Sequence, residues 1–491
     1  MSRFADSLLL TEDPQLLTNM RQVLDTDQKA LEINLNNKVY GAFAEIGAGQ
    51  EVARYFFKVG AAAGTIAKTM SAYDKVVSDD IYGIESSGRY VCENRLYKML
   101  DHEWDLMVTR LGVRRPDTCF FAFADTIAAL NFSRTIKGDG WLGIRFQLKP
   151  GGDANDLVLH VKMLDNDTQL QQQAVGILGV NLIYACYNYE GDPETMIHSL
   201  MDGLYDRISI DMVRLTGPDF EELDNRLLAL WLVKHKMTDV AMFGPDKQNV
   251  HASEFLYKKH VLVVRGSFHP PTNMHLDMIK QTYEQFRADK EVNADRSFVL
   301  TELTLDNLCG EGELDEKDFL DRSELLCALG QTVVVSNCEQ YHQLINYLAD
   351  YKIQHLGIAI EARRMLEFIS EKYYQNMDGR LLAAFGEVFT KIVRFYIYPS
   401  YQEGSEELMM VNNLPVPEGF KFLYQHLIDD GQIIDIKKYN PDVLHIFTKE
   451  VMELLKIGQT GWENKVPPKV EKLVKEKYLF GYPFEQMEFE Y

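Results

Sequence analysis

The residues of this sequence best suited to chemistry form a short turn, residues 266–275, which reads GSFHPPTNMH. An apolar strand candidate, 261–264, leads into Gly266, and two prolines stiffen the loop before Thr272. Thr272 occupies the position of a helix N-cap, so the free backbone N–H groups of the first helical turn, from Asn273 onward, point back at the loop. Such an arrangement at the carboxyl end of a strand binds anions. The turn therefore predicts a phosphate or nucleotide site.

The same segment resembles the GSFNPxTNMHL segment of nicotinamide-mononucleotide adenylyltransferases of the eukaryotic type, within the T/H-x-G-H nucleotidyltransferase group. Eight of the ten positions from 266 to 275 agree; the departures are His269, where the family usually has Asn, and Pro271, a variable position. The resemblance implies a Rossmann-like domain that transfers AMP from ATP to a mononucleotide such as nicotinamide mononucleotide, a step of NAD biosynthesis. Pyrophosphate is the leaving group of this reaction.

The resemblance also implies roles for individual residues. Thr272 and His275 contact the ATP phosphates, and His275 stabilises the charge that develops during transfer. Gly266 lets the nucleotide approach the backbone, and His269 offers a further phosphate donor when protonated. Mg²⁺, held mainly by the ATP phosphates, is the implied cofactor. The predicted site is therefore catalytic His275 and Thr272, with Gly266, Ser267, Phe268, His269 and Asn273 for nucleotide binding.

A second interpretation follows from what the sequence lacks. The family's other signature, S-x-T-x-x-R, supplies an Arg to the triphosphate, and the nearest approach, Thr390 to Arg394, is one residue too long and lacks the Ser. The acidic stretch 311–321 is also unfavourable to phosphate. The alternative is a non-catalytic nucleotide-sensing or scaffold protein built on a degenerate α/β domain, nucleotidyltransferase-like or phosphatase-like. Residues 325–337 resemble the second motif of haloacid-dehalogenase-type phosphatases, without a nucleophilic Asp.

Other patterns carry weaker signals. Residues 43–49 and the helix after them resemble the first motif of Rossmann-type methyltransferases, although a plain strand-to-helix turn is the favoured interpretation. The histidines between 235 and 275 include no i,i+4 pair and no Cys accompanies them, so no metal site of protein ligands is predicted. The carboxylates around residues 217–218, Asp211 among them, are typical of a turn and an acidic helix start. Trp141 is assigned to hairpin packing.

The elements that must position these residues alternate regularly only in the second half. Short apolar strands separated by helices of ten or more residues predict a mostly parallel, Rossmann-like sheet there, and the first half predicts a mixed α/β arrangement. The fold class is therefore α/β, with a mixed α/β domain of unknown role at 1–250 (sub-boundary near 115) and a Rossmann-like, nucleotidyltransferase-like domain with a helical C-terminal tail at 251–491. Helices are predicted at 14–35, 51–59, 62–73, 89–111, 169–187, 225–236, 272–287, 318–329 and 339–351, and strands at 39–46, 119–124, 142–148, 157–163, 208–213, 239–243, 261–264, 297–303, 332–336, 355–360 and 393–398.

Composition limits the partners. The 491 residues carry a formal net charge of −22 without a basic stripe, which argues against nucleic acid as a partner. No run approaches the ~18 apolar residues that a membrane span needs. The six cysteines are scattered without metal spacing, as expected in a reducing compartment, so a cytoplasmic protein is predicted. A small-molecule nucleotide is the expected partner, and the oligomeric state is left open, a homo-oligomer included. As a whole the chain resembles a group of long bacterial proteins, which implies no mechanism.

Overall fold

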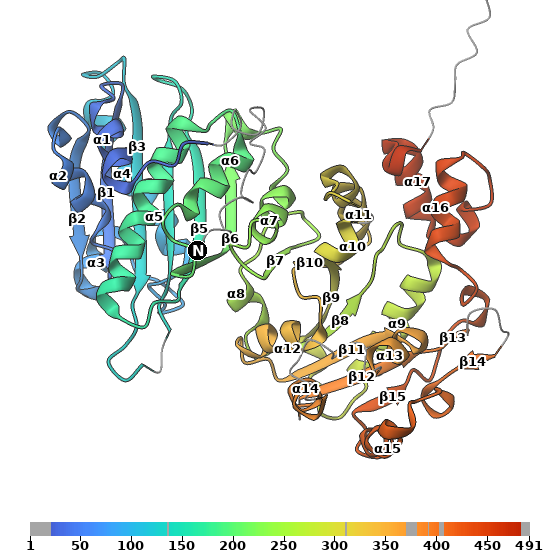
Figure 1. Ribbon diagram of the computed structural model, residues 1–491. Coiled ribbons are helices and arrows are strands. Elements are labelled where there is room, and N and C mark those ends of the chain that lie inside the picture. Colours follow the sequence, from blue (N-terminus) through green and yellow to red (C-terminus); the bar gives the residue numbers. More distant parts are fainter. Residues whose placement is uncertain are drawn as a thin grey trace, which may run out of the picture.

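Two twisted sheets lie one after the other along the chain, each with helices on both faces (Figure 1). The computed structural model describes residues 21–134, 137–309, 312–369, 381–390, 392–401 and 407–482. Parallel strands alternate with helices in the second sheet, whereas the first sheet mixes parallel and antiparallel pairs, so the predicted α/β fold class is confirmed. Within the described ranges, no helix combines the length and apolar character that crossing a membrane requires.

The first sheet has the strand order β2-β1-β3-β4-β5-β6. The two neighbours of β1 are parallel to it, and the remaining pairs are antiparallel. Its strands, in chain order, are β1 (Val39–Gly47), β2 (Ile66–Ala72), β3 (Cys119–Ala128), β4 (Asp139–Phe146), β5 (Asn155–Met163) and β6 (Ile208–Thr216).

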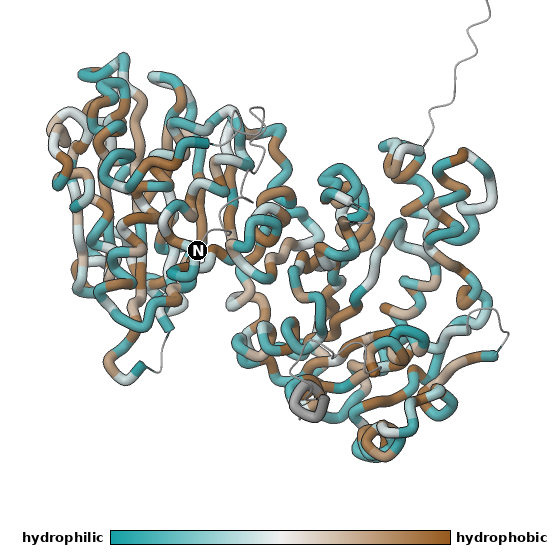
Figure 2. Tube along the Cα trace, viewed as in Figure 1, coloured by the Kyte–Doolittle hydropathy of each residue, from teal (hydrophilic) through white to brown (hydrophobic). Residues whose placement is uncertain are grey.

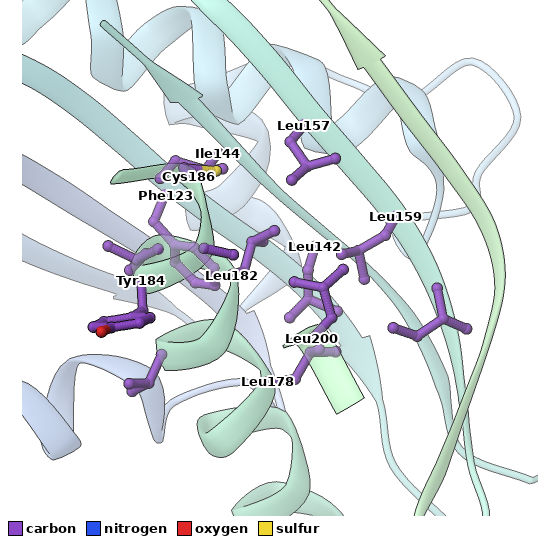
Figure 3. Packing of buried hydrophobic residues seen from close by; sticks show 14 of the residues in the cluster. Phe123, Leu142, Ile144, Leu157, Leu159, Leu178, Leu182, Tyr184, Cys186 and Leu200 are labelled. Atoms are coloured by element: carbon purple, nitrogen blue, oxygen red, sulfur yellow. The ribbon is translucent and has the colours of Figure 1, made fainter. Parts of the chain in front are cut away.

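One long helix provides a large part of the core of the first half. This helix, α5 (Thr168–Asn188), is apolar on most of its sides, and its buried residues pack on the strands of the first sheet (Figure 3). Leu178 and Leu182 are fully buried there, and each such side chain contributes about 1.5–3 kcal/mol relative to exposure. The other helices of this half are α1 (Thr26–Leu35), α2 (Val52–Val59), α3 (Lys75–Tyr82), α4 (Glu93–Leu111), α6 (Pro193–His198) and α7 (Asn225–Lys234).

One predicted helix of the first half is wrong. Residues 62–73 form a short 3-10 turn, Ala62–Gly64, followed by strand β2, which pairs in parallel with β1. The alanines of this segment and Met70 favour a helix, but the open edge of β1 offers unpaired backbone groups, and pairing with them outweighs the local preference. Of the predicted helix 14–35, the described part contains Thr26–Leu35; residues 14–20 lie outside the described residues.

The second sheet has the order β15-β12-β11-β8-β9-β10-β7. All of its described pairs are parallel except β10 with β7, which confirms a mostly parallel sheet. The chain runs outward from β8 through β9 to β10 and then returns to β11 on the other side of β8. The strands are β7 (Val240–Phe243), β8 (His260–Arg265), β9 (Ser297–Thr304), β10 (Thr332–Ser336), β11 (His355–Glu361), β12 (Val393–Tyr398) and β15 (Ile433–Asp435), with β13 (Ser400–Tyr401) and β14 (Leu408–Met409) forming a separate pair.

Both faces of the second sheet are buried. Along β8, Leu262 and Val264 enter one hydrophobic core, and Val261 and Val263 enter the core on the opposite face. Figure 2 shows the hydrophobic residues running along the strands of both sheets. The helices α9 (Asn273–Arg287), α11 (Glu316–Ala328), α16 (Thr448–Lys456) and α17 (Pro468–Lys477) contribute to the first of these cores, and α8 (Ala252–Leu256), α12 (Tyr341–Ala349), α13 (Ala362–Phe368), α14 (Leu381–Val388) and α15 (Lys421–Asp429) to the second; α10 (Leu305–Cys309) follows β9.

The two halves share a helix. Leu228 and Leu232 of α7 pack in the core of the first half, whereas Leu230 and Val233 pack in the core of the second. Strand β7, which follows α7 and precedes residue 251, is an edge strand of the second sheet. The junction between the halves is therefore a packed region of the protein.

Candidate functional site

A cavity of about 920 Å³ lies where the second sheet changes its direction of winding. Gly266 and Ser267, which follow β8, line it together with Glu361 and Arg363, at and just beyond the end of β11. Parallel strands β8 and β11 are neighbours, so their carboxyl ends open on the same side. Ligands of open α/β sheets bind in the crevice at this switch point, and the volume is typical of a small-molecule site.

The helix beside the cavity, α9, begins with an interlocked cap formed by Thr272 and His275. The Thr272 hydroxyl oxygen accepts the His275 backbone N–H at 3.5 Å, as the sequence predicted for the N-cap. In return, the Thr272 backbone N–H donates to His275 Nδ1 at 3.1 Å, and the Thr272 hydroxyl lies 2.9 Å from the same nitrogen. Because a backbone N–H can only donate, Nδ1 is unprotonated, and the single proton of the neutral ring is on Nε2.

The imidazole of His275 is neutral under ordinary conditions. Burial, with a smaller contribution from the positive charge of Arg364, lowers its pKa to about 4. The side chain lines the cavity, and no hydrogen bond of Nε2 is found within the described part of the chain. His275 therefore provides one N–H donor at the helix end without carrying a charge.

This arrangement predicts a pH dependence of stability. The pKa of His275 is lower in the folded chain than the ordinary 6.5, so the unfolded chain binds more protons between pH 6.5 and 4. The His275 contribution should therefore be lost as the pH falls through this window, by about 3 kcal/mol in total, which corresponds to about 2.5 pKa units. Urea unfolding of the wild type and His275→Gln across this range should show a flatter pH profile for the variant. Parallel profiles would contradict the prediction.

The remaining predicted residues occupy several environments. Gly266 and Ser267 line the cavity, and a Cβ on Gly266 would make a tight contact, 3.1 Å, with the ring of Phe268. Phe268 itself is fully buried, with its ring centroid 5.0 Å from that of His275. Its contact with His275 makes it a support for the imidazole.

His269 and Asn273 are not part of the lining of the main cavity. His269 Nε2 lies 2.9 Å from Asp318 Oδ1, at a second cavity of about 410 Å³ whose lining is rich in acidic side chains. Asn273 Nδ2 donates to the backbone oxygen of Asn464 at 3.0 Å and so ties α9 to the C-terminal segment. The structure thus brings Gly266, Ser267 and His275 together on the main cavity and leaves His269 and Asn273 outside it.

Basic residues that the sequence analysis did not single out also line the cavity. Arg363, Arg364 and Lys449 surround it, and within the described residues none of the three forms an ion pair. By contrast, Arg394, the nearest approach to the second family signature, forms an ion pair with Asp289 and does not line this cavity. Arg363 and Arg364 could have been found from the sequence, because they closely follow the predicted strand 355–360 and residues at strand ends line such crevices.

The acidic stretch that was unfavourable to phosphate has a structural role. Asp318 and Arg322 form an ion pair at 2.5 Å, and Arg322 Nη1 donates to the backbone oxygen of Ser267 at 3.0 Å.

The main cavity is flanked by Tyr401 and His445, whose rings stack with centroids 4.6 Å apart. The cavity therefore combines cations, one neutral imidazole donor and an aromatic wall.

Comparisons with known proteins find only distant similarity. No protein-family model and no curated protein sequence matches the chain. Among solved structures, a Plasmodium falciparum nicotinic acid mononucleotide adenylyltransferase is 11% identical, with 46% of this chain and 100% of that one covered and a TM-score of 0.29. A putative nicotinate-nucleotide adenylyltransferase from Vibrio parahaemolyticus is 13% identical, with 45% and 95% covered and a TM-score of 0.19. The competence/damage inducible protein CihA from Agrobacterium tumefaciens is 16% identical, with 34% and 98% covered and a TM-score of 0.24. Scores of this size carry no functional argument.

Proposed function

We propose that the second half of the chain binds ATP in the main cavity and transfers AMP to a mononucleotide such as nicotinamide mononucleotide. The observation that carries the proposal is the neutral His275, whose Nδ1 is held by Thr272 while its side chain lines a cavity at the switch point of the sheet. The amides at the start of α9 add the positive end of a helix dipole. The resemblance of residues 266–275 to adenylyltransferases supports the same reaction.

In the proposed reaction, a phosphate oxygen of the mononucleotide attacks the α-phosphorus of ATP, and the bond to the β-phosphate oxygen breaks to release pyrophosphate. Such transfers need positioning and charge stabilisation more than covalent chemistry. His275 Nε2–H would donate to a phosphate oxygen on which charge develops. Arg363, Arg364 and Lys449 would neutralise the triphosphate in place of the absent S-x-T-x-x-R arginine.

Mg²⁺ fits this proposal as an ion carried by ATP. The cavity lining includes the carboxylate of Glu361, an oxygen donor of the kind that Mg²⁺ prefers. When bound, the ion would neutralise phosphate charge, and the phosphates would supply most of its ligands. Stacked Tyr401 and His445 would offer an aromatic surface to the adenine.

Pyrophosphate release from purified full-length chain, given ATP, Mg²⁺ and nicotinamide mononucleotide, tests the proposal directly. We expect release that depends on both nucleotides. A thermal shift with each nucleotide, measured in parallel, reports binding separately from turnover. Stabilisation by ATP without any release would favour the second candidate, a non-catalytic nucleotide sensor, which the engagement of Arg394 with Asp289 supports. If the chain neither binds the nucleotides nor releases pyrophosphate, both candidate functions are excluded.

Arg364→Gln is expected to raise the KM for ATP by about 10- to 100-fold. A hydrogen bond between charged groups contributes about 1.5–3 kcal/mol, and Arg364 has no protein carboxylate to hold it within the described residues. The matched control is Arg287→Gln, which removes an exposed arginine at the far end of α9. Steady-state kinetics with ATP as the varied substrate checks the prediction, and an equal effect of both substitutions would contradict it.

A further inference from the structure

A second group of chemically active side chains lies at the junction of the two halves, far along the chain from His275. His160 on β5, Asp211 on β6 and His251 directly before α8 each offer a ligand atom, and these atoms all lie within 4.8 Å of one another. All three side chains are buried, with 1–4% of each exposed. The sequence did not predict this group, because its members come from three separate elements.

Hydrogen bonding within the group is incomplete. His160 Nδ1 lies 2.7 Å from Asp211 Oδ1, but His160 Nε2 and Asp211 Oδ2 are buried and form no hydrogen bond within the described residues. Lys162 Nζ approaches Asp211 Oδ2 only to 3.4 Å, and its own hydrogen bond goes to the Tyr351 hydroxyl. Buried polar atoms normally have partners, so two such atoms in one cluster point to a missing ligand.

The spacing of the atoms suits a metal ion. His251 Nε2 and Asp211 Oδ2 are 3.7 Å apart, too far for a hydrogen bond. A tetrahedral zinc ion with bonds of about 2.0–2.1 Å separates its ligand atoms by about 3.3–3.4 Å. Small movements of the two side chains would therefore admit the ion between them.

The surroundings of the group fix its imidazoles in place. Ser253 Oγ lies 2.9 Å from His251 Nδ1, a contact that holds this ring in its orientation. Trp141 packs edge-on against both imidazoles, with centroid distances of 5.0 Å to His160 and 5.3 Å to His251. Trp141 thus has the packing role expected for it, against these rings.

We propose that His160, Asp211 and His251 bind a divalent transition-metal ion of the zinc type. Two imidazoles and one carboxylate form a donor set that such ions favour, and hard ions such as Mg²⁺ prefer oxygen ligands alone. His160 and His251 line a cavity of about 1040 Å³, to which Asp139 also contributes a carboxylate 3.6 Å from His160 Nε2. Three protein ligands beside an open cavity leave a coordination position for water or a ligand, as in catalytic zinc sites.

Zinc titration of the full-length chain, stripped with a chelator, tests the proposal. We expect isothermal titration calorimetry with Zn²⁺ to show one ion per chain, and Co²⁺ to give the visible absorption of a four-coordinate site. His160→Gln, Asp211→Asn and His251→Gln should each weaken Zn²⁺ binding by more than about 100-fold, because loss of a supporting partner alone costs 10–100-fold. The matched control is His235→Gln, a partly exposed histidine that lines the same cavity and lies 2.8 Å from Glu194.

The outcomes separate the proposal from adventitious binding. Zinc affinity that is lost in His235→Gln but kept in the other variants would place the ion at the surface pair and overturn the proposal. No equimolar zinc binding by the wild type would overturn it as well. Near-UV circular dichroism of each variant checks folding, and the Co²⁺ spectrum of the wild type tests the site without any substitution. None of these measurements depends on AMP transfer.

Discussion

His275→Ala is expected to slow pyrophosphate release by about 10²–10³-fold, the usual loss when one preorganised donor to a developing negative charge is removed. The imidazole is held by two groups of Thr272 and is neutral, so its Nε2–H needs no rearrangement before reaction. The effect should fall on kcat more than on the KM for ATP, because the donor strengthens its hydrogen bond as charge develops. Single-turnover and steady-state pyrophosphate assays measure the two quantities.

Two further variants make this result interpretable. His275→Gln keeps a side-chain N–H donor and should recover part of the lost rate, whereas a general packing defect would not respond to the restored donor. His355→Gln alters another buried histidine of the same sheet, on β11, and should leave the rate unchanged. Turnover in His275→Ala equal to that of the wild type would remove the proposed role of this residue.

The net charge of −22 does not oppose an anionic ligand at this place. Salt screens charges beyond about 8–10 Å, so the cations that line the cavity decide the local potential. Arg363, Arg364 and Lys449 provide three positive charges there. The lining also includes the carboxylates of Glu361, Glu450 and Glu453, of which Glu450 is engaged by Lys465 at 3.0 Å. Composition therefore limits macromolecular partners but is a poor guide to a small nucleotide.

Sequence patterns predicted what depends on neighbours in the chain. The apolar runs at Thr332–Ser336 and Val393–Tyr398 are strands with the predicted bounds, because both are short, β-branched or aromatic, and buried on both faces. The Thr272 cap could likewise be predicted from the sequence, because the capping residue and its partner His275 are three positions apart in the chain. The helix predicted at residues 62–73 is wrong because the conformation of this segment depends on pairing with β1, a strand that lies elsewhere in the sequence.

The parts of both sites that were missed depend on which strands become neighbours. Arg363 and Arg364 reach the cavity because β11 pairs with β8, although two strands and four α-helices separate these strands in the chain. His160, Asp211 and His251 meet only because β5 pairs with β6 and the chain before α8 returns to this edge. Local spacing rules for metal sites, such as i,i+4 histidines, do not detect ligands from three elements.

The glycine turn after β1 leads to a second prediction of large effect. A Cβ on Gly49 would lie 1.9 Å from Asp125 Oδ1, and one on Gly47 would lie 2.2 Å from the Ile127 oxygen. Close packing of the turn against β3 thus accounts for both glycines, in agreement with a plain strand-to-helix turn. It also places Asp125 opposite Glu45 in register, both buried.

Glu45→Gln is expected to raise the free energy of unfolding at pH 7 by about 3 kcal/mol. Burial raises the pKa of Glu45 to about 7, despite a hydrogen bond from the Val52 backbone N–H, and burial together with Glu45 raises the pKa of Asp125 well above its usual value. The folded chain therefore holds protons that the unfolded chain releases, and the wild type loses stability as the pH rises from about 4.5 to 7. About 2.5 pKa units at Glu45 correspond to the stated gain.

The glutamine of the Glu45→Gln variant should also stabilise the fold through its hydrogen bonds. Its carbonyl oxygen can still accept the Val52 N–H, and its amide can donate to Asp125, whose carboxylate oxygens form no hydrogen bond within the described residues. Urea unfolding at pH 5 and pH 7 measures the effect, which should be small at the lower pH and large at the higher. The control Glu190→Gln removes an exposed carboxylate and should change stability by less than about 0.5 kcal/mol. A Glu45→Gln protein that is less stable than the wild type at pH 7 would show that the carboxylate has a partner which compensates its burial.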